Sequence, residues 1–374
     1  MYRSGRHFLQ IPGPTNVPDR VLRSIDAPTI DHRGPDFAEL GLEVLAGLRG
    51  VFKTTGDVVV YPASGTGAWE AALVNTLSPG DKVVAFETGH FATLWRAMAS
   101  RLGLRVVWLE GDWRHGADPS RIAEALNDDV RAVMVVHNET STGVTSRVAD
   151  VRAAMGDHDA LLLVDTISSL ASIDYRHDEW GVDVSVGGSQ KGLMLPAGLS
   201  FNAVSDKALA TRGTLPRSYW DWDPIIAANQ AGFWPYTSAT NLLYGLREAL
   251  AMLREEGLEN VFARHSRHAA ATRAAVAGWG LEVLAMDERE LSSSLTAVVL
   301  DGSDEVRRVI LERFDMSLGA GLGQLQDKVF RIGHLGSFND LMLAGTLCGV
   351  QMGLRVAGHD VRDGVGAALE CLAS

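Results

Sequence analysis

Short apolar runs recur between residues 57 and 204, and they restrict the fold more than any other feature of the chain. They read "DVVVYP", "KVVAF", "LRVVWLE", "RAVMVVHNE", "ALLLVDT", "VDVSVGG" and "GLSFNAVS". Most are continuous rather than alternating, which is typical of strands buried on both faces of a parallel sheet. Helical patterns such as "GAWEAALVNTL" and "FATLWRAMASRLG" separate several of them. Alternating strands and helices predict an α/β fold with crossover helices.

The pattern changes from Asn241 onward. Two helical stretches, "NLLYGLREALAMLREEG" and "LENVFARHSRHAAATRAAVAGWG", follow each other with no strand between them. Strand-like runs near "LTAVVL" and "VFRIG" then indicate a second, smaller α/β unit. A chain of 374 residues also exceeds the size at which a single core stops growing. We therefore expect an N-terminal arm over residues 1–20, a large domain over 21–257 and a small C-terminal domain over 258–374.

Composition argues against several classes of function. Thirty-four basic against forty-six acidic side chains give a formal charge of -12, without a basic cluster, which argues against nucleic acid or an anionic membrane as partner. No segment has the length and hydropathy of a membrane span or a signal peptide. Cys348 and Cys371 are too few for a disulfide framework or a zinc cluster. We expect a cytoplasmic protein without a metal site.

Polar residues follow three of the apolar runs, at the point where each predicted strand ends. They are His137, Asn138 and Glu139 after one run, Asp165 after the next, and Ser189, Gln190 and Lys191 after a third. Ligands of open parallel sheets bind beyond the carboxyl ends of the strands. The sequence therefore predicts a binding site at this edge of the sheet.

Two of these residues indicate the chemistry. A partly desolvated lysine among glycines, as Lys191 is in "GGSQKG", can form a Schiff base with a carbonyl; the alternative is a solvated loop lysine. A carboxylate directly after buried apolar residues, as Asp165 is, is costly unless a cation or a hydrogen-bond donor meets it. The protonated ring nitrogen of pyridoxal phosphate would do so. The alternative for Asp165 is a helix N-cap.

A third stretch, "YPASGTGAWEAALVNTL", predicts an anion site. A strand stops at Pro62 and a helix begins after it, so that free N–H groups and the positive end of the helix dipole meet at Ser64, Gly65 and Thr66. The stretch has neither P-loop spacing nor a dinucleotide fingerprint, and a simple capped helix is the alternative. Together with the lysine and the acid, it predicts a pyridoxal phosphate cofactor.

The chain resembles the class V aminotransferases of fold type I, in particular the serine-glyoxylate and aspartate-glyoxylate branch. The resemblance covers nearly the full length through "IPGPTNVP", "SGTGAWE", "NTLSPGDKV", "HNETSTGV", "LLLVDTISS", "DEWGVDV", "GSQKGLMLP", "WPYT", "EGLENVFARH" and "KVFRIGHLG". It implies a large domain with a mostly parallel seven-stranded sheet, a smaller C-terminal α/β domain, and a homodimer with active sites at the subunit interface.

The resemblance also implies residue roles. Lys191 would hold the cofactor covalently and move the substrate proton, and Asp165 would keep the ring nitrogen charged. Further cofactor contacts would come from Ser64, Gly65, Thr66, Phe91, Thr140, Ile167 and Gln190, and from Tyr236 and Thr237 of a neighbouring subunit. Arg331 would grip the substrate carboxylate, with Gly13 and His32 also at the substrate.

Other roles remain open for several of these residues. Phe91, where relatives often have a tryptophan, could be a core aromatic. Tyr236 and Thr237 could form a turn beside Pro235. Arg331 could pair with a surface acid, and His32 could belong to a helix cap.

The function implied is transfer of an amino group from L-serine or L-aspartate, with L-alanine as a further candidate, to glyoxylate, giving glycine and a 2-oxo acid. One alternative is a cysteine desulfurase, which needs a nucleophilic cysteine on a mobile loop. Another is a non-catalytic protein that binds pyridoxal phosphate.

Overall fold

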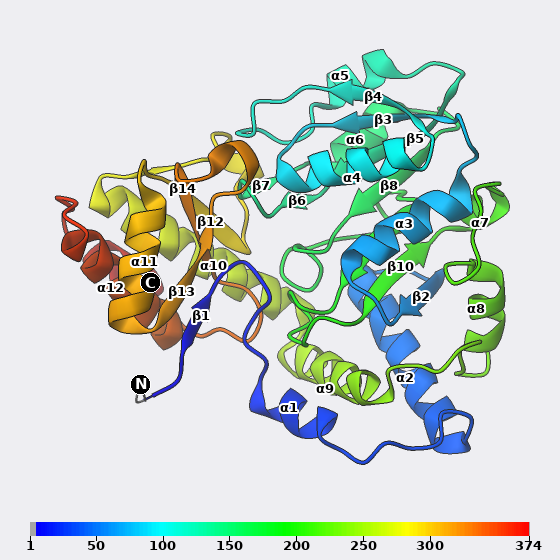
Figure 1. Ribbon diagram of the computed structural model, residues 1–374, viewed down its shortest axis with the longest axis horizontal. Helices are drawn as coiled ribbons and strands as arrows, with labels where there is room; N and C mark the ends of the chain where they lie inside the picture. The colour runs from blue at the N-terminus through cyan, green and yellow to red at the C-terminus, as the bar shows by residue number, and fades with distance from the viewer. Residues whose placement is uncertain (1–4, 374) are drawn as a thin grey trace.

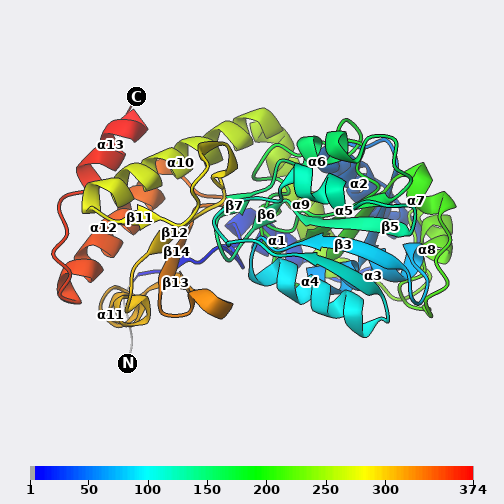
Figure 2. The ribbon, with the colours of Figure 1, turned by 90° about the horizontal axis from the view of Figure 1, so that it is seen from above.

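The structure, a computed structural model, describes residues 5–373. Two sheets lie side by side, each with its own helices, and the long helix α10 (Leu258–Trp279) runs from one to the other (Figures 1 and 2). No helix within the described residues is long and apolar enough to cross a membrane.

The larger sheet has seven strands in the order β2-β10-β9-β8-β5-β3-β4. They are β2 (Asp57–Tyr61), β3 (Lys82–Phe86), β4 (Arg105–Leu109), β5 (Val130–Val136), β8 (Leu161–Asp165), β9 (Val184–Gly188) and β10 (Ser200–Val204). Only β10 runs antiparallel to its neighbours. Each apolar run of the sequence forms one strand, so the prediction of a mostly parallel seven-stranded sheet is confirmed.

Helices cover both faces of this sheet, with α3 and α4 on one side and α2 and α6 on the other (Figure 2). The helices of this part are α1 (Asp19–Ile25), α2 (Pro35–Phe52), α3 (Gly65–Thr76), α4 (His90–Arg101), α5 (Pro119–Ala125), α6 (Val148–Met155), α7 (Asp206–Ala210), α8 (Trp222–Asn229) and α9 (Thr240–Glu256). Helix α3 is buried on almost every side, because it packs against β9 and β10 and also contacts α4. Continuous apolar strands and apolar helices thus form one large core.

The smaller sheet has the order β1-β13-β14-β12-β11. Its strands are β1 (Phe8–Gln10), β11 (Glu282–Val283), β12 (Leu295–Val299), β13 (Met316–Ala320) and β14 (Val329–Gly333), and its helices are α11 (Ser303–Phe314), α12 (Asp340–Val356) and α13 (Val365–Ala373). A short hairpin of β6 (Asn138–Glu139) and β7 (Val144–Thr145) and the 3₁₀ turns η1 (Glu288–Glu290) and η2 (Gly323–Leu325) complete the chain. The small sheet and the second half of α10 enclose a separate apolar core around Trp279 and Phe330.

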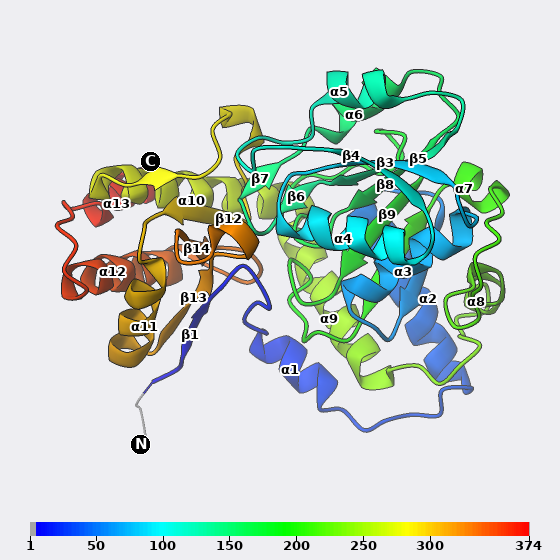
Figure 3. The same ribbon diagram turned by 45° about the horizontal axis from the view of Figure 1, so that its top comes forward.

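The N-terminal segment joins the two sheets. Strand β1 pairs in parallel with β13, and the chain then passes between the sheets to reach α1 (Figure 3). On the way, Thr15 N–H donates to the carbonyl of Gln190 at 3.1 Å and Thr15 Oγ1 donates to that of Lys191 at 3.1 Å. Part of the expected arm is therefore an edge strand of the small sheet. The division near Gly257, where α9 gives way to α10, stays a proposal.

Candidate active site

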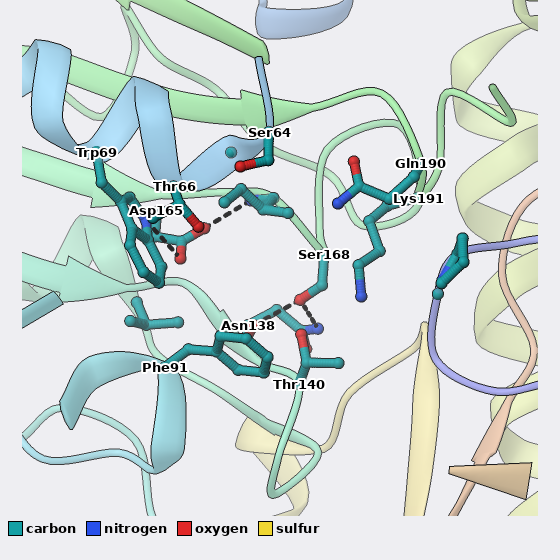
Figure 4. Close-up of a pocket in the computed structure, with 15 residues that line it drawn as sticks. Ser64, Thr66, Trp69, Phe91, Asn138, Thr140, Asp165, Ser168, Gln190 and Lys191 are labelled. Carbon is teal, nitrogen blue, oxygen red and sulfur yellow. Dashed lines mark hydrogen bonds between the residues drawn. The ribbon is translucent and has the colours of Figure 1, made fainter. Parts of the chain in front are cut away.

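A cavity of about 230 Å³ lies at the carboxyl ends of the central strands (Figure 4). The predicted residues that line it are Gly13, Ser64, Gly65, Thr66, Phe91, Thr140, Asp165, Ile167, Gln190 and Lys191. Asn138, noted in the sequence only as the end of a strand, lines it too. Pro14, Trp69, Val136 and Ser168 also line it and were not singled out by the sequence.

Lys191 follows β9 and is 8% exposed. Burial lowers its pKa to about 7, and the nearby charge of Arg331 acts in the same direction. Its Nζ donates to the Pro12 carbonyl. Gly13 lies beside this side chain and has φ +103°, a backbone conformation that favours glycine, and a Cβ there would lie 2.6 Å from Lys191 Nζ unless the lysine moved. The lysine can therefore become a neutral amine near neutral pH.

Asp165 is the last residue of β8 and is 4% exposed. Its Oδ1 accepts from the Ile167 amide at 2.7 Å and its Oδ2 accepts from Trp69 Nε1 at 3.0 Å. Burial raises its pKa to about 7. Figure 4 shows Asp165 and Lys191 on opposite sides of the cavity. A cation bound between them would stabilise the ionised acid.

The start of α3 lies at the cavity, where the sequence predicts an anion site. Ser64 is the N-cap and makes no side-chain capping hydrogen bond. The Gly67 amide donates to the Ser64 carbonyl at 2.9 Å, and the amides of Gly65 and Thr66 have no hydrogen-bond partner among residues 5–373. A Cβ at Gly65 would overlap the side chain of Ile167, which lies close against this turn. Near it, the side-chain oxygen of Gln190 is buried without a hydrogen-bond partner among residues 5–373. Such a group is expected to gain its partner from a ligand.

Phe91 lies at the start of α4, and its ring lines the cavity (Figure 4). The carboxylate of Glu139, which is fully buried, accepts from the amides of Phe91 at 3.3 Å and Ala92 at 3.1 Å. This contact attaches the helix to the β6–β7 hairpin that follows β5 and fixes where the ring lies. Phe91 therefore faces the cavity in addition to packing on the core.

Arg331 lies on β14 of the small sheet and is 7% exposed. Its Nη1 donates to the Thr140 carbonyl and its Nε donates to the Ala320 carbonyl, both at 2.7 Å. Burial lowers its pKa to about 10, which keeps it charged at neutral pH. No salt bridge joins it to a carboxylate in the described part of the chain. The alternative of pairing with a surface acid does not describe this arginine.

The structure does not bring His32, Tyr236 and Thr237 to the cavity of the same chain. His32 and Thr237 line a separate pocket of about 320 Å³, and the Nε2 atom of His32 is buried there without a partner among residues 5–373. Tyr236 stacks on Tyr219 with ring centroids 4.7 Å apart. These residues precede α2 and α9, whereas the cavity is built on the strand ends.

Within residues 5–373 there is no group of three or more His, Cys, Asp or Glu side chains that could hold a metal ion. Cys348 is exposed on α12 and Cys371 lies on α13, and neither lines the cavity. Within residues 5–373, no cysteine therefore lies where it could attack a substrate bound in the cavity.

The chain belongs to the class-V aminotransferase family, whose model matches residues 7–311. It is 48% identical to a serine-glyoxylate aminotransferase of Methylorubrum extorquens, over 98% of this chain and 95% of that protein. It is 43% identical to an L-aspartate-glyoxylate aminotransferase of Paracoccus denitrificans, over 96% of this chain and 93% of that protein. The fold matches ureidoglycine-glyoxylate aminotransferase of Bacillus subtilis with a TM-score of 0.92 and 28% identity, covering 100% of both chains.

A second solved structure, pyridoxamine-pyruvate aminotransferase of Mesorhizobium loti, matches with a TM-score of 0.93 and 26% identity, over 100% of this chain and 99% of that one. The predicted family and the type I fold are thus confirmed. The chain is an aminotransferase, and its cofactor is pyridoxal phosphate. The cavity fits this group, because it offers an amine, a buried acid opposite it and an anion site at a helix start.

Proposed function

We propose that this aminotransferase transfers the amino group of a small L-amino acid to glyoxylate, giving glycine and the corresponding 2-oxo acid. The observation that carries the proposal is the placement of Lys191 and Asp165, both buried, across one cavity beside the start of α3. The similarity to serine-glyoxylate and L-aspartate-glyoxylate aminotransferases over nearly the whole chain supports the choice of substrates.

The residues that line the cavity would have different roles in the reaction. When bound, pyridoxal phosphate supplies a carbonyl that exchanges amines and a ring that accepts electron density. Lys191 would hold the cofactor covalently and, once displaced, carry a proton from the substrate Cα, for which a pKa near neutrality suits it. Asp165 would hold the ring nitrogen in its charged form. The start of α3 would bind the phosphate together with Gln190, and Phe91, Thr140 and Ile167 would enclose the ring.

Arg331 would bind the α-carboxylate of the substrate. The carbonyls of Thr140 and Ala320 fix its guanidinium through Nη1 and Nε, and Nη2 has no protein partner among residues 5–373. A planar fork held in this way is suited to a bidentate contact with a carboxylate. Gly13 lies beside Lys191 and would leave room for a small substrate.

The cavity favours L-serine over L-aspartate as the donor. Its lining includes the Thr140 hydroxyl, which makes no hydrogen bond among residues 5–373 and can bond to a substrate hydroxyl, whereas Lys191, its only basic lining residue in the described part of the chain, would hold the cofactor. A second carboxylate would need a further cation to offset its desolvation. We infer that an aspartate donor would require help from a neighbouring subunit.

We also propose a homodimer in the cytoplasm. The pocket of His32 and Thr237 lies apart from the cavity of the same chain, and the buried unpaired Nε2 of His32 suggests a contact that one chain does not supply. A second copy could bring these residues and Tyr236 to the cofactor phosphate and the substrate. The mixing experiment in the Discussion tests this arrangement.

Initial rates with L-serine, L-aspartate and L-alanine, each against glyoxylate, test the substrates. We expect the highest kcat/KM with L-serine, and activity with a different acceptor alone would refute the assignment of glyoxylate. Borohydride treatment followed by peptide mass analysis should place the cofactor on Lys191. Active protein in which that side chain stays unmodified would contradict the proposed mechanism.

A further inference from the structure

Trp69 lines the cavity, yet nothing in the sequence pattern gives it a role. It lies on α3, just after the Ser64–Thr66 segment, and is 3% exposed. Its Nε1 donates to Oδ2 of Asp165 at 3.0 Å, while Oδ1 accepts from the Ile167 amide at 2.7 Å. Figure 4 shows the indole beside Asp165, on the side away from Lys191. Each oxygen of the acid thus has one protein donor.

Packing fixes the direction of this donor. The Trp69 ring stacks on the ring of Trp95 from α4, with centroids 5.8 Å apart and planes 14° from parallel. Trp95 is 1% exposed, and its own Nε1 is buried without a partner among residues 5–373. The two indoles stack on each other, but of the two only Trp69 donates a hydrogen bond to a carboxylate. They form a natural pair for separating hydrogen bonding from packing.

The surroundings of Asp165 oppose its ionisation. Burial raises its pKa to about 7, and the negative charge of Glu139 acts in the same direction. The Ile167 amide, the Trp69 N–H and the charge of Lys191 act in the opposite direction. A neutral acid could not keep a ring nitrogen charged. The donors on its oxygens therefore decide whether Asp165 can do so.

One more titratable group, Tyr175, interacts with Asp165. Burial in the first place, and then the charge of Asp165, raise the pKa of Tyr175, which stays a neutral phenol at neutral pH. Tyr175 donates to or accepts from Ser185 Oγ at 2.6 Å. Because Tyr175 is neutral, Glu139 and Lys191 are the charged groups that influence the ionisation of Asp165.

We propose that Trp69 is a positioning residue for Asp165: its indole N–H holds Oδ2 and stabilises the ionised carboxylate that faces the ring nitrogen of the cofactor. This inference rests on the role proposed for Asp165. Without the N–H, the proton shared by the acid and the ring nitrogen shifts towards the acid. The ring then accepts less electron density, while no group assigned to the substrate moves. Loss of the bond should lower kcat and leave KM nearly unchanged.

The test compares the Trp69→Phe and Trp95→Phe holoenzymes at saturating pyridoxal phosphate. Phenylalanine keeps an aromatic ring at either position and removes the N–H. For W69F we expect kcat to fall about tenfold and KM for L-serine to stay within about threefold. The pH midpoint of the visible absorption change of the bound cofactor should rise by about half a unit or more, because the nitrogen that joins the cofactor to Lys191 holds its proton more tightly when the ring nitrogen carries no positive charge.

For W95F we expect wild-type values in all three measurements. A W69F enzyme with wild-type kcat and midpoint overturns the inference. Equal losses of kcat in both variants with unmoved midpoints also overturn it, since they would assign the effect to packing.

Asp165→Asn separates this inference from the proposed function. It should raise the midpoint further than W69F does, and the double variant should match Asp165→Asn alone, because the two changes act through one group. If Asp165→Asn leaves the midpoint unmoved, the role of Asp165 itself fails. If Asp165→Asn moves it and W69F does not, only the role of Trp69 fails.

A measurement on the unaltered side chain covers the case in which W69F does not fold. In cofactor-free protein with ¹⁵N-labelled indoles, one N–H signal should titrate together with Asp165, with a midpoint near 7. That signal should stay constant in Asp165→Asn, and the Trp95 signal, identified with W95F, should not titrate. A spectrum in which no indole signal responds between about pH 5 and about pH 9 overturns the inference.

Discussion

The cofactor cavity and the pocket of His32 and Thr237 are built in different ways. The cavity walls come from the ends of parallel strands and from helices that start there, and hydrogen bonds to protein groups fix its charged residues Asp165 and Lys191. The other pocket comes from two connecting segments, before α2 and before α9, and leaves a buried histidine nitrogen without a partner in the described chain. On the proposed arrangement, the unpaired group of the first region, the Gln190 oxygen, would gain its partner from the cofactor, and that of the second from another copy of the chain.

On the proposed arrangement, this difference separates the contacts that one subunit supplies from those that need a second copy. In the proposed mechanism, one sheet brings together the residues that enclose the cofactor ring, the acid that contacts its ring nitrogen and the lysine that holds it. The last contacts to phosphate and substrate depend, on the proposed arrangement, on a second copy. Changes in the cavity should therefore act within one chain, and changes in the second pocket should act across the dimer.

Lys191→Ala is expected to have the largest effect. Without the amine, the chain has neither a covalent anchor nor a base at the substrate Cα, and turnover should fall by at least about 10³-fold. Steady-state kinetics with L-serine and glyoxylate measures this. Lys207→Ala, which removes an exposed lysine that donates to the Ala160 carbonyl, is the control and should keep nearly full activity. Substantial turnover by Lys191→Ala would contradict the mechanism.

The same comparison shows what the sequence could predict. Asp165, Lys191 and Ser64 each follow or end an apolar run, and parallel strands bring such ends to one edge, so their meeting was predictable. Trp69 was not predictable in this way, because an aromatic residue on an apolar helix has the pattern of a core residue. Only the three-dimensional course of α3 shows that its N–H meets Asp165.

The small sheet was predicted less fully for a related reason. Two of its strands, β12 and β14, contain apolar runs that the sequence shows. Strand β1 has three residues and β11 has two, and β13 reads "MSLGA", so none of them has a strong local pattern. They form strands because neighbours in the sheet pair with them.

Arg331→Ala should have the next largest effect and should act mainly on substrate binding. Loss of a charged bidentate contact, worth about 2 to 3 kcal/mol, predicts an increase of KM for L-serine of about 30- to 150-fold. Arg331→Lys should recover part of this loss. The affinity for pyridoxal phosphate serves as the control, since Arg331 also holds the Thr140 carbonyl. A large loss of cofactor affinity with an unchanged KM would make Arg331 a structural residue.

Thr237→Ala should have a smaller effect, a rise of the dissociation constant of pyridoxal phosphate of about tenfold, as expected for one lost hydrogen bond to a charged group. Mixing it with Lys191→Ala locates the contact. If Thr237 acts across the interface, a mixed dimer has one site with both native residues, and activity at limiting cofactor should rise above that of either variant alone. If Thr237 acts within its own chain, mixing should restore nothing, and the proposed dimer site would be wrong.

The smallest effect is expected in the stability of the cofactor-free protein, which has no activity, as a function of pH. The pKa of Asp165 is raised to about 7 in the folded chain, so between its ordinary value near 4 and 7 the folded state binds more protons than the unfolded state. Its contribution to stability is present below about pH 4 and is lost as pH rises through 7. Lys191 has the opposite sign above pH 7, because its folded pKa lies below its ordinary value.

Melting temperatures of wild type and Asp165→Asn, both without cofactor, isolate the contribution of the acid. The melting temperature of wild type relative to the variant should fall by several degrees between about pH 4 and about pH 8. Asp157→Asn, at an exposed position, should show no such trend. Saturation with pyridoxal phosphate should remove the fall, since a charged ring nitrogen beside Asp165 lowers the pKa of the acid. If the difference between the two melting temperatures stays constant with pH, the cavity does not raise the pKa of Asp165. The contrast between a cavity whose acid needs a bound cation and the second pocket would then be lost.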